Sequence, residues 1–260
     1  MQSKSYSLPD ILSRLNIDAL NDMQTTSIAT NEQHSNVVLL SATGSGKTLA
    51  FLLPILDLLD PQNKKTQALI VVPSRELAMQ IEKVFKSLGT WYKVTCCYGG
   101  HLRETEENNL LQPPALLIGT PGRLGDHIRR GNITVDTIET LVLDEFDKTL
   151  ESGFYEEVAF IISSLPALKK RILTSATEAV EIPDFIGLEN PVKLNFLSAT
   201  DELPEGLAIK LVQSDEKDKL KTLFKLICYL GNRSTVVFCN HRESVERTSA
   251  YLTEQTITNV

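Results

Sequence analysis

The chain is short of several residue types, and each shortage excludes a class of protein. It has four cysteines in 260 residues, none in a Cys-x-x-Cys pair, and four histidines without metal-ligand spacing. A disulfide framework and a cysteine zinc site are therefore not expected, and a cytoplasmic location fits best. No apolar run reaches the length of a membrane-spanning helix, and the first residues lack the apolar core of a signal peptide. We expect no membrane contact.

Positive charge is also scarce. The net charge is −7, from 26 basic and 33 acidic residues. Residues 209–260 contain eight basic and six acidic residues and so carry +2, which leaves −9 on the first 208 residues. Nucleic acid could therefore bind only at a local basic surface, because the field of the whole chain repels phosphates.

What the chain does contain is an alternation of short apolar segments with longer helix-like segments. The predicted strands are 37–40, 68–72, 94–98, 115–118, 140–143 and 171–174. The predicted helices are 49–59, 75–88, 102–111, 123–130 and 155–165. Continuous apolar strands that alternate with helices predict an α/β fold, a parallel sheet with helices on both faces. Ligands of such sheets bind at the carboxyl ends of the strands.

A glycine-rich segment follows the first predicted strand and opens the first long helix. It reads Ser41-Ala42-Thr43-Gly44-Ser45-Gly46-Lys47-Thr48, and Ser41 stands where the Gly-x-x-x-x-Gly-Lys-[Ser/Thr] pattern has its first glycine. Such a turn lets backbone N–H groups converge on phosphates at a helix N-terminus. Lys47 would reach the β and γ phosphates, and the Thr48 hydroxyl would ligate Mg²⁺. The segment predicts a nucleoside triphosphate site; the alternative is an ordinary glycine-rich turn.

Two acids, Asp144 and Glu145, end the apolar strand at 140–143. Phosphoryl transfer needs one acid to hold Mg²⁺ through water and another to orient and deprotonate the attacking water. Alternatively, the acids only cap the following helix. The glycine-rich segment upstream favours hydrolysis.

An ordered series of short motifs carries a family resemblance. Asp144-Glu145-Phe146-Asp147 resembles the Asp-Glu-Ala-Asp signature of DEAD-box ATP-dependent RNA helicases, with Phe146 in place of Ala. Further blocks follow that family's order: Pro73-Ser74-Arg75-Glu76-Leu77-Ala78, Gly99-Gly100, Thr120-Pro121-Gly122-Arg123, Ser175-Ala176-Thr177 and Val236-Val237-Phe238-Cys239-Asn240. Each block is weak alone, but the ordered set is specific and spans residues 6–251.

The resemblance implies a division into domains. Residues 1–197 would form a first RecA-like P-loop NTPase domain, 198–208 a linker, and 209–260 an incomplete second RecA-like domain with strands at 209–212 and 235–238 and helices at 217–230 and 243–253. The family's His-Arg-x-Gly-Arg-x-x-Arg block, which supplies an arginine to the transferring phosphate, does not occur in this sequence. We therefore expect this chain to bind ATP and Mg²⁺ but to hydrolyse ATP poorly and unwind little.

The resemblance also implies roles for single residues. Gln24 matches the family's adenine-reading glutamine, whose carboxamide can pair with a donor and an acceptor on one base edge, and Tyr6 could stack on the base. The implied catalytic residues are Lys47, Asp144, Glu145 and Asp147. Ser175, Ala176 and Thr177 would couple ATP to RNA, with both hydroxyls bonded to Asp147.

The implied partner is single-stranded RNA or a short duplex. The protein would hold its sugar-phosphate backbone, so binding would be largely independent of sequence. The implied contacts are Arg75, Gly99, Gly100, Thr120, Pro121, Gly122 and Arg123.

Two other functions remain open. One is a short module that binds RNA or a protein partner without turnover. The other is a different P-loop enzyme, such as a kinase or DNA translocase, which would not need Gln24, residues 120–123 and residues 175–177 together. We expect an ATP-dependent RNA helicase whose ATP-binding domain lies in this chain.

Overall fold

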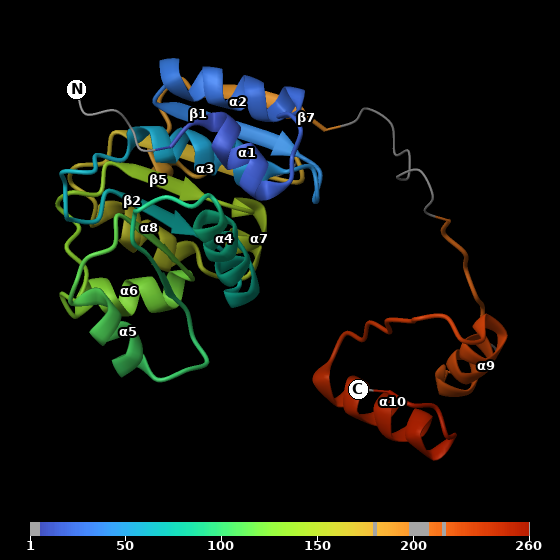
Figure 1. Cartoon of the computed structure of the whole chain (residues 1–260). Coiled ribbons are helices and arrows are strands. Elements are labelled where there is room, and N and C mark those ends of the chain that lie inside the picture. The colour runs from blue at the N-terminus through green and yellow to red at the C-terminus, as the bar shows by residue number, and fades with distance from the viewer. Residues whose placement is uncertain (1–5, 179–180, 198–207, 215–216, 260) are drawn as a thin grey trace. The chain divides into compact units, whose positions relative to one another are not determined.

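A computed structural model describes residues 6–178, 181–197, 208–214 and 217–259. The chain divides into two compact units, Met1–Asp201 and Glu202–Val260. The first unit is built on a seven-stranded sheet in the order β3-β4-β2-β5-β6-β1-β7, and all six neighbouring pairs are parallel (Figure 1). The strands are β1 (Asn36–Ser41), β2 (Ala68–Val71), β3 (Val94–Cys97), β4 (Leu116–Gly119), β5 (Thr140–Leu143), β6 (Lys170–Ser175) and β7 (Val192–Phe196).

The six strands predicted from apolar runs all form, and each end lies within one residue of the prediction. The sequence prediction missed β7. This strand lies at the edge of the sheet beside β1, and its partly buried residues alternate with exposed ones such as Lys193 and Asn195. An edge strand that is covered on one face has an alternating pattern rather than the continuous apolar run by which the inner strands were found.

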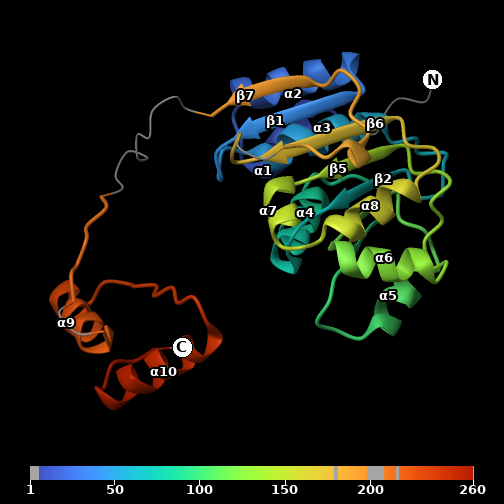
Figure 2. The same ribbon diagram turned by 180° about the vertical axis from the view of Figure 1, so that it is seen from behind.

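Helices cover both faces of this sheet, as the two opposite views show (Figures 1 and 2). Successive strand residues such as Leu69 and Ile70 point to opposite faces and belong to two separate apolar cores. One face carries α1 (Leu8–Leu15), α2 (Asp22–Gln33), α3 (Lys47–Leu58) and α4 (Arg75–Ser87), and the other carries α5 (Arg103–Leu110), α6 (Pro121–Arg129), α7 (Phe146–Glu151) and α8 (Tyr155–Ser163). A short 3-10 turn, η1 (Asp184–Ile186), packs near α8.

Helices α1, α2 and α7 were not predicted. The inward face of α2 explains its omission, because three of its four buried residues, Gln24, Ser27 and Asn31, are polar. The Ser27 hydroxyl donates to the Ala50 carbonyl on α3, 2.8 Å away. A helix that packs through polar side chains lacks the apolar period by which helices are found in sequence.

The second unit contains α9 (Leu220–Leu230) and α10 (Arg242–Glu254), both of which were predicted. The strands predicted at 209–212 and 235–238 are wrong, since neither segment is a strand and Phe238 is 92% exposed. A strand needs a neighbour for its backbone N–H and C=O groups, and the described residues of this unit pair with none. Most of the predicted linker, residues 198–207, lies outside the described residues. Within the described part of the chain, every helix is too short or too polar to span a bilayer.

Candidate active site

The glycine-rich loop joins β1 to α3 at the carboxyl edge of the sheet. Gly44 and Gly46 have φ angles of +82° and +92°, a region that favours glycine. A Cβ atom added at Gly44 would meet no atom within 4 Å, so the loop is open on that side. The Lys47 ammonium lies within the loop and donates to the Ser41 carbonyl at 2.6 Å. The loop therefore has the backbone form and the lysine of a phosphate site.

Ser41, which replaces the first glycine of the pattern, fits its position. The residue is fully buried, and its hydroxyl is hydrogen bonded to the Ser45 hydroxyl across the loop. A small side chain is accommodated here because it points into the loop and finds a polar partner there.

The acids that end β5 lie at the same edge of the sheet. Asp144 is buried and accepts a hydrogen bond from the Thr174 hydroxyl on β6. Burial raises the pKa of Asp144 to about 6. Glu145 follows with a φ of +48°, unusual for a residue with a side chain, and this turns the chain sharply into α7. Its carboxylate pairs with the Lys148 ammonium at 2.9 Å.

Lys47 and these acids interact electrostatically. Burial lowers the pKa of Lys47, and the negative charges of Asp144, Glu145 and Asp147 oppose that shift. Strand β6 alone separates β1 from β5 in the sheet. The lysine-bearing loop and the paired acids therefore lie together, as the sequence predicted.

Gln24 is held at the first turn of α2 by a reciprocal capping box with Asn21. Its carboxamide oxygen accepts from the Asn21 backbone N–H at 3.0 Å, and its amide nitrogen donates to the Gly46 carbonyl at 3.2 Å. The Asn21 amide in turn donates to the Ser45 carbonyl at 3.0 Å. The start of α2 is thus bonded directly to the glycine-rich loop.

A second group of predicted residues follows β2, β3 and β4 at this edge. Arg75 opens α4, and a Cβ atom added at Gly100 would lie 3.1 Å from its Nη1 atom, so the arginine lies against the Gly99-Gly100 turn. Thr120 precedes α6, and Pro121 occupies the first turn of that helix. Arg123, which the resemblance gives as an RNA contact, has its guanidinium 3.2 Å from the Glu106 carboxylate, and its side chain is 16% exposed.

Residues 21–185, more than half of the chain, match the family model of DEAD/DEAH box helicases. The chain belongs to the DEAD/DEAH box helicase family.

Curated relatives agree with this assignment. The chain is 35% identical over 224 residues to DEAD-box ATP-dependent RNA helicase 8 of Arabidopsis thaliana, covering 84% of this chain and 44% of the relative. It is 34% identical over 228 residues to ATP-dependent RNA helicase eIF4A of Botryotinia fuckeliana, covering 86% of this chain and 57% of the relative. The chain therefore spans about half the length of the curated relatives it matches.

A solved DEAD box protein shares the fold. The crystal structure of the protein from Methanococcus jannaschii superimposes with a TM-score of 0.67 at 25% identity, covering 97% of this chain and 69% of that one. This match and the parallel sheet confirm the predicted α/β, RecA-like P-loop fold.

This chain differs from the Asp-Glu-Ala-Asp signature at one position, where Phe146 replaces Ala. The packing of Phe146 explains why the larger side chain fits. Phe146 begins α7, is 3% exposed and belongs to the apolar core that contains Leu143 and Val158. The aromatic ring faces the protein interior rather than the nucleotide edge.

The coupling segment forms only one of its two predicted contacts. The Thr177 hydroxyl donates to the Asp147 carboxylate at 3.2 Å. The Ser175 hydroxyl instead donates to the Thr177 carbonyl and accepts from the Thr177 N–H, a local turn that uses the one hydrogen this hydroxyl could donate to Asp147. The other carboxylate oxygen of Asp147, Oδ1, is buried without a hydrogen-bond partner among the described residues.

Tyr6, which the resemblance offers as a base-stacking residue, packs against α3. Its hydroxyl donates to the Leu56 carbonyl at 2.8 Å, about 14 Å along α3 from Lys47 at a rise of 1.5 Å per residue. The ring packs against the apolar core on that face. The structure gives Tyr6 a packing role.

Sequence reasoning also missed a cluster around Glu106. No motif includes this residue, and the nearby histidines were assigned no role. The signal that could have found it is weak: a single acid on the buried side of a short, polar helix.

Proposed function

We propose that this chain is the ATP-binding part of an ATP-dependent RNA helicase. One observation supports it most strongly: Lys47, Asp144 and Glu145 lie at one edge of a parallel sheet, close enough for their charges to interact. The relatives named as ATP-dependent RNA helicases support the same activity.

ATP would bind with its phosphates in the loop of residues 41–48. The open side of Gly44 leaves space for a phosphate against the backbone N–H groups. Lys47 would exchange its bond to the Ser41 carbonyl for the β and γ phosphates, a stronger charge-assisted contact.

Thr48 and Asp144 are the residues that would hold Mg²⁺. A hydroxyl and a carboxylate are oxygen ligands of the kind this ion prefers, and Asp144 is mostly ionised at neutral pH with a pKa of about 6. The bound ion would neutralise charge on the phosphates. Glu145 would orient the attacking water and accept its proton.

The base would be read by Gln24. A carboxamide has two donor hydrogens and two acceptor lone pairs, and the bonds to the Gly46 carbonyl and the Asn21 N–H use one of each. One donor and one acceptor remain, which complement the acceptor and the donor on one edge of adenine.

RNA would bind along the ends of β2, β3 and β4. The N-termini of α4 and α6 present partial positive charge at that edge, and α6 has no side-chain cap on its first N–H groups, which suits phosphates. Arg75 is half-exposed and pairs with the Glu76 carboxylate at 2.7 Å, so RNA would compete with that acid for it. An added Cβ at Gly99 or Gly122 would meet nothing within 4 Å, so RNA could approach closely. Single-stranded RNA or a short duplex held by its backbone would be the partner.

The remaining parts of the proposal concern the whole protein. Residues 209–260 would be an incomplete second RecA-like domain after a linker at 198–208, and residues 175–177 would couple ATP to RNA through Asp147. This chain would bind ATP but hydrolyse it poorly, because it lacks the family's arginine block.

The four free thiols of the chain suit a location in the reducing cytoplasm.

The test is ATP affinity, measured by calorimetry with Mg²⁺ for the chain and for Lys47→Ala. The variant should lose at least about tenfold in affinity, since it removes a charge-assisted contact. Lys83→Ala, at an exposed position on α4, is the control and should bind normally. Equal affinity of Lys47→Ala and the unchanged chain would refute the site. Glu145→Gln should keep ATP binding and remove the remaining turnover.

A further inference from the structure

Helix α5 carries a buried acid, Glu106, which is 1% exposed. Its Oε1 atom accepts from the Tyr98 backbone N–H at 2.8 Å and lies 2.9 Å from His101 Nε2. Its Oε2 atom lies 2.7 Å from His127 Nε2 and 3.2 Å from Arg123 Nη1. One carboxylate therefore meets four nitrogen atoms from two segments, residues 98–101 after β3 and helix α6.

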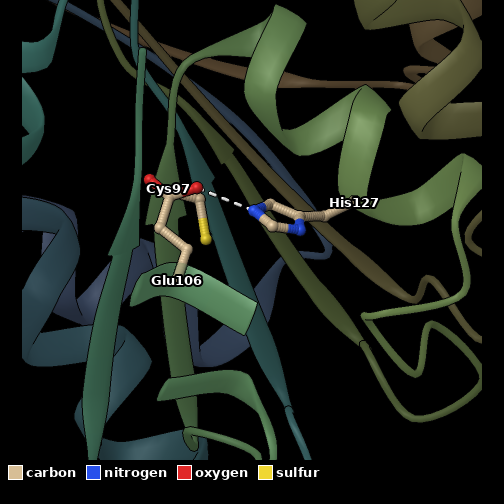
Figure 3. Close-up of side chains that lie close together, drawn as sticks. All are labelled: Cys97, Glu106 and His127. Atoms are coloured by element: carbon tan, nitrogen blue, oxygen red, sulfur yellow. Dashed lines mark hydrogen bonds and ion pairs between the residues drawn. The ribbon is translucent and has the colours of Figure 1, made fainter. Parts of the chain in front are cut away.

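Cys97, Glu106 and His127 form a buried group whose ligand atoms lie within 4.8 Å of one another (Figure 3). These side-chain types resemble a transition-metal site. The network argues against one, because the Asn132 amide donates to His127 Nδ1 at 3.0 Å, which leaves the proton on Nε2 to donate to Glu106. Burial also raises the pKa of the Cys97 thiol, and the Arg123 cation would repel a metal ion.

The four nitrogen partners of Glu106 lie in or beside the segments that are predicted to contact RNA, the Gly99-Gly100 turn and the start of α6. Tyr98 directly precedes the Gly99-Gly100 turn, and His101 directly follows it. Arg123 and His127 lie on α6, the helix that opens with Thr120 and Pro121. Glu106 therefore ties the turn after β3 to the helix after β4.

We propose that Glu106 is a positioning residue for RNA binding, which acts by holding the Gly99-Gly100 turn and α6 in one fixed arrangement. The inference rests on the proposed RNA function. It also assigns a different role to Arg123, whose charge is neutralised by Glu106 within the network. The phosphate contacts of α6 then come from its N-terminal N–H groups, and the Arg123 side chain supports them from behind.

The experiment titrates a fluorescent oligouridine with the whole chain in Mg²⁺ and ATP at several salt concentrations. Glu106→Gln should bind RNA about tenfold more weakly, because its amide N–H₂ group faces the donors that the carboxylate accepted from. ATP affinity should not change. Arg123→Gln should show a similar loss, and the double variant should lose no more than either single one. Glu104→Gln, exposed on the same helix, should bind as the unchanged chain does.

The salt dependence separates support from direct contact. A lost phosphate contact on single-stranded RNA lowers the slope of log affinity against log salt by about 0.7, whereas loss of a supporting residue leaves it unchanged. A lowered slope for Arg123→Gln, or normal RNA binding by Glu106→Gln, would overturn the proposal. If Glu106→Gln does not fold, Arg123→Gln decides by the same criterion. Failure of the unchanged chain to bind RNA would refute the proposed function and this inference together.

Discussion

The Gln24 side chain forms hydrogen bonds with two elements, the start of α2 and the glycine-rich loop. Its carboxamide completes the capping box of α2 and also bonds to the Gly46 carbonyl in the glycine-rich loop. The resemblance predicted a base-reading role, but only the structure shows that these local bonds orient the amide. The orientation depends on Asn21 and Gly46. The spacing of Asn21 and Gln24 is that of a capping box, but no local pattern in the sequence connects Gln24 with Gly46.

The first prediction concerns base preference. Gln24→Ala should reduce the preference for ATP over GTP by about 1–3 kcal/mol, the value of a bidentate pair with a base. Competition binding of the two nucleotides measures the preference. Gln33→Ala, exposed near the end of the same helix, is the matched control. An unchanged preference in Gln24→Ala would remove this residue from the base site.

Glu106 is the residue that sequence reasoning had least chance of finding. Its partners lie at positions 98, 101, 123 and 127, and their meeting depends on the pairing of β3 with β4 and on the placement of α5 and α6. No local spacing encodes such a contact, since it forms only when separate elements pack together.

At the scale of elements, the glycine-rich loop depends on α2 as well as on β1 and α3. The Asn21 side chain caps α2 through Oδ1, which accepts from the Gln24 N–H at 2.9 Å, and reaches the loop through Nδ2, which donates to the Ser45 carbonyl. A cap and a loop contact thus share one side chain.

The second prediction separates these two roles. Asn21→Ala should lower the free energy of unfolding by about 1 kcal/mol through loss of the cap, and it should weaken ATP binding through loss of the loop contact. Asn21→Ser should retain the cap and hence the stability, but it should show the same weaker ATP binding. Urea unfolding and ATP calorimetry measure the two effects. Wild-type ATP affinity in Asn21→Ser would show that the loop contact is dispensable.

The elements also show which sequence signals are reliable. Six strands were predicted to within one residue. Strands such as β2, β4 and β5 are buried along their whole length, which leaves continuous apolar runs, whereas the edge strand β3 alternates in burial and was found through its β-branched residues Val94 and Thr95. The edge strand β7 and the helix α2 were missed because an alternating strand and a polar inward face lack those runs. The segments 209–212 and 235–238 have strand-like sequences and yet form no strand, since pairing is a tertiary requirement.

At the scale of the whole molecule, apolar residues have different surroundings in the two units. The first unit buries most of its large apolar side chains in cores on both faces of the sheet, although Trp91 and Leu111 are 91% and 80% exposed. In the described part of the second unit, Leu211 and Phe238 are 89% and 92% exposed. The same residue type therefore contributes to stability in one unit and little in the other.

The third prediction compares two phenylalanines on this basis. Phe146→Ala should destabilise the first unit by about 3–5 kcal/mol, because it leaves a cavity in the core. Phe238→Ala should change stability by less than about 0.5 kcal/mol. Urea unfolding followed by circular dichroism compares the two. A large loss for Phe238→Ala would mean that this ring is covered in solution.

Gly46 leaves no room for a side chain, because an added Cβ would lie 2.5 Å from the Gln24 amide nitrogen. The crowding makes the phosphate end and the base end of the nucleotide site mechanically dependent on each other. Any movement of the loop on binding phosphates would move the Gly46 carbonyl, and the carboxamide bonded to that carbonyl would turn as well. An adenine nucleotide with fewer phosphates would therefore encounter the Gln24 carboxamide in a different orientation. Discrimination between bases should then grow with the number of phosphates that the ligand carries.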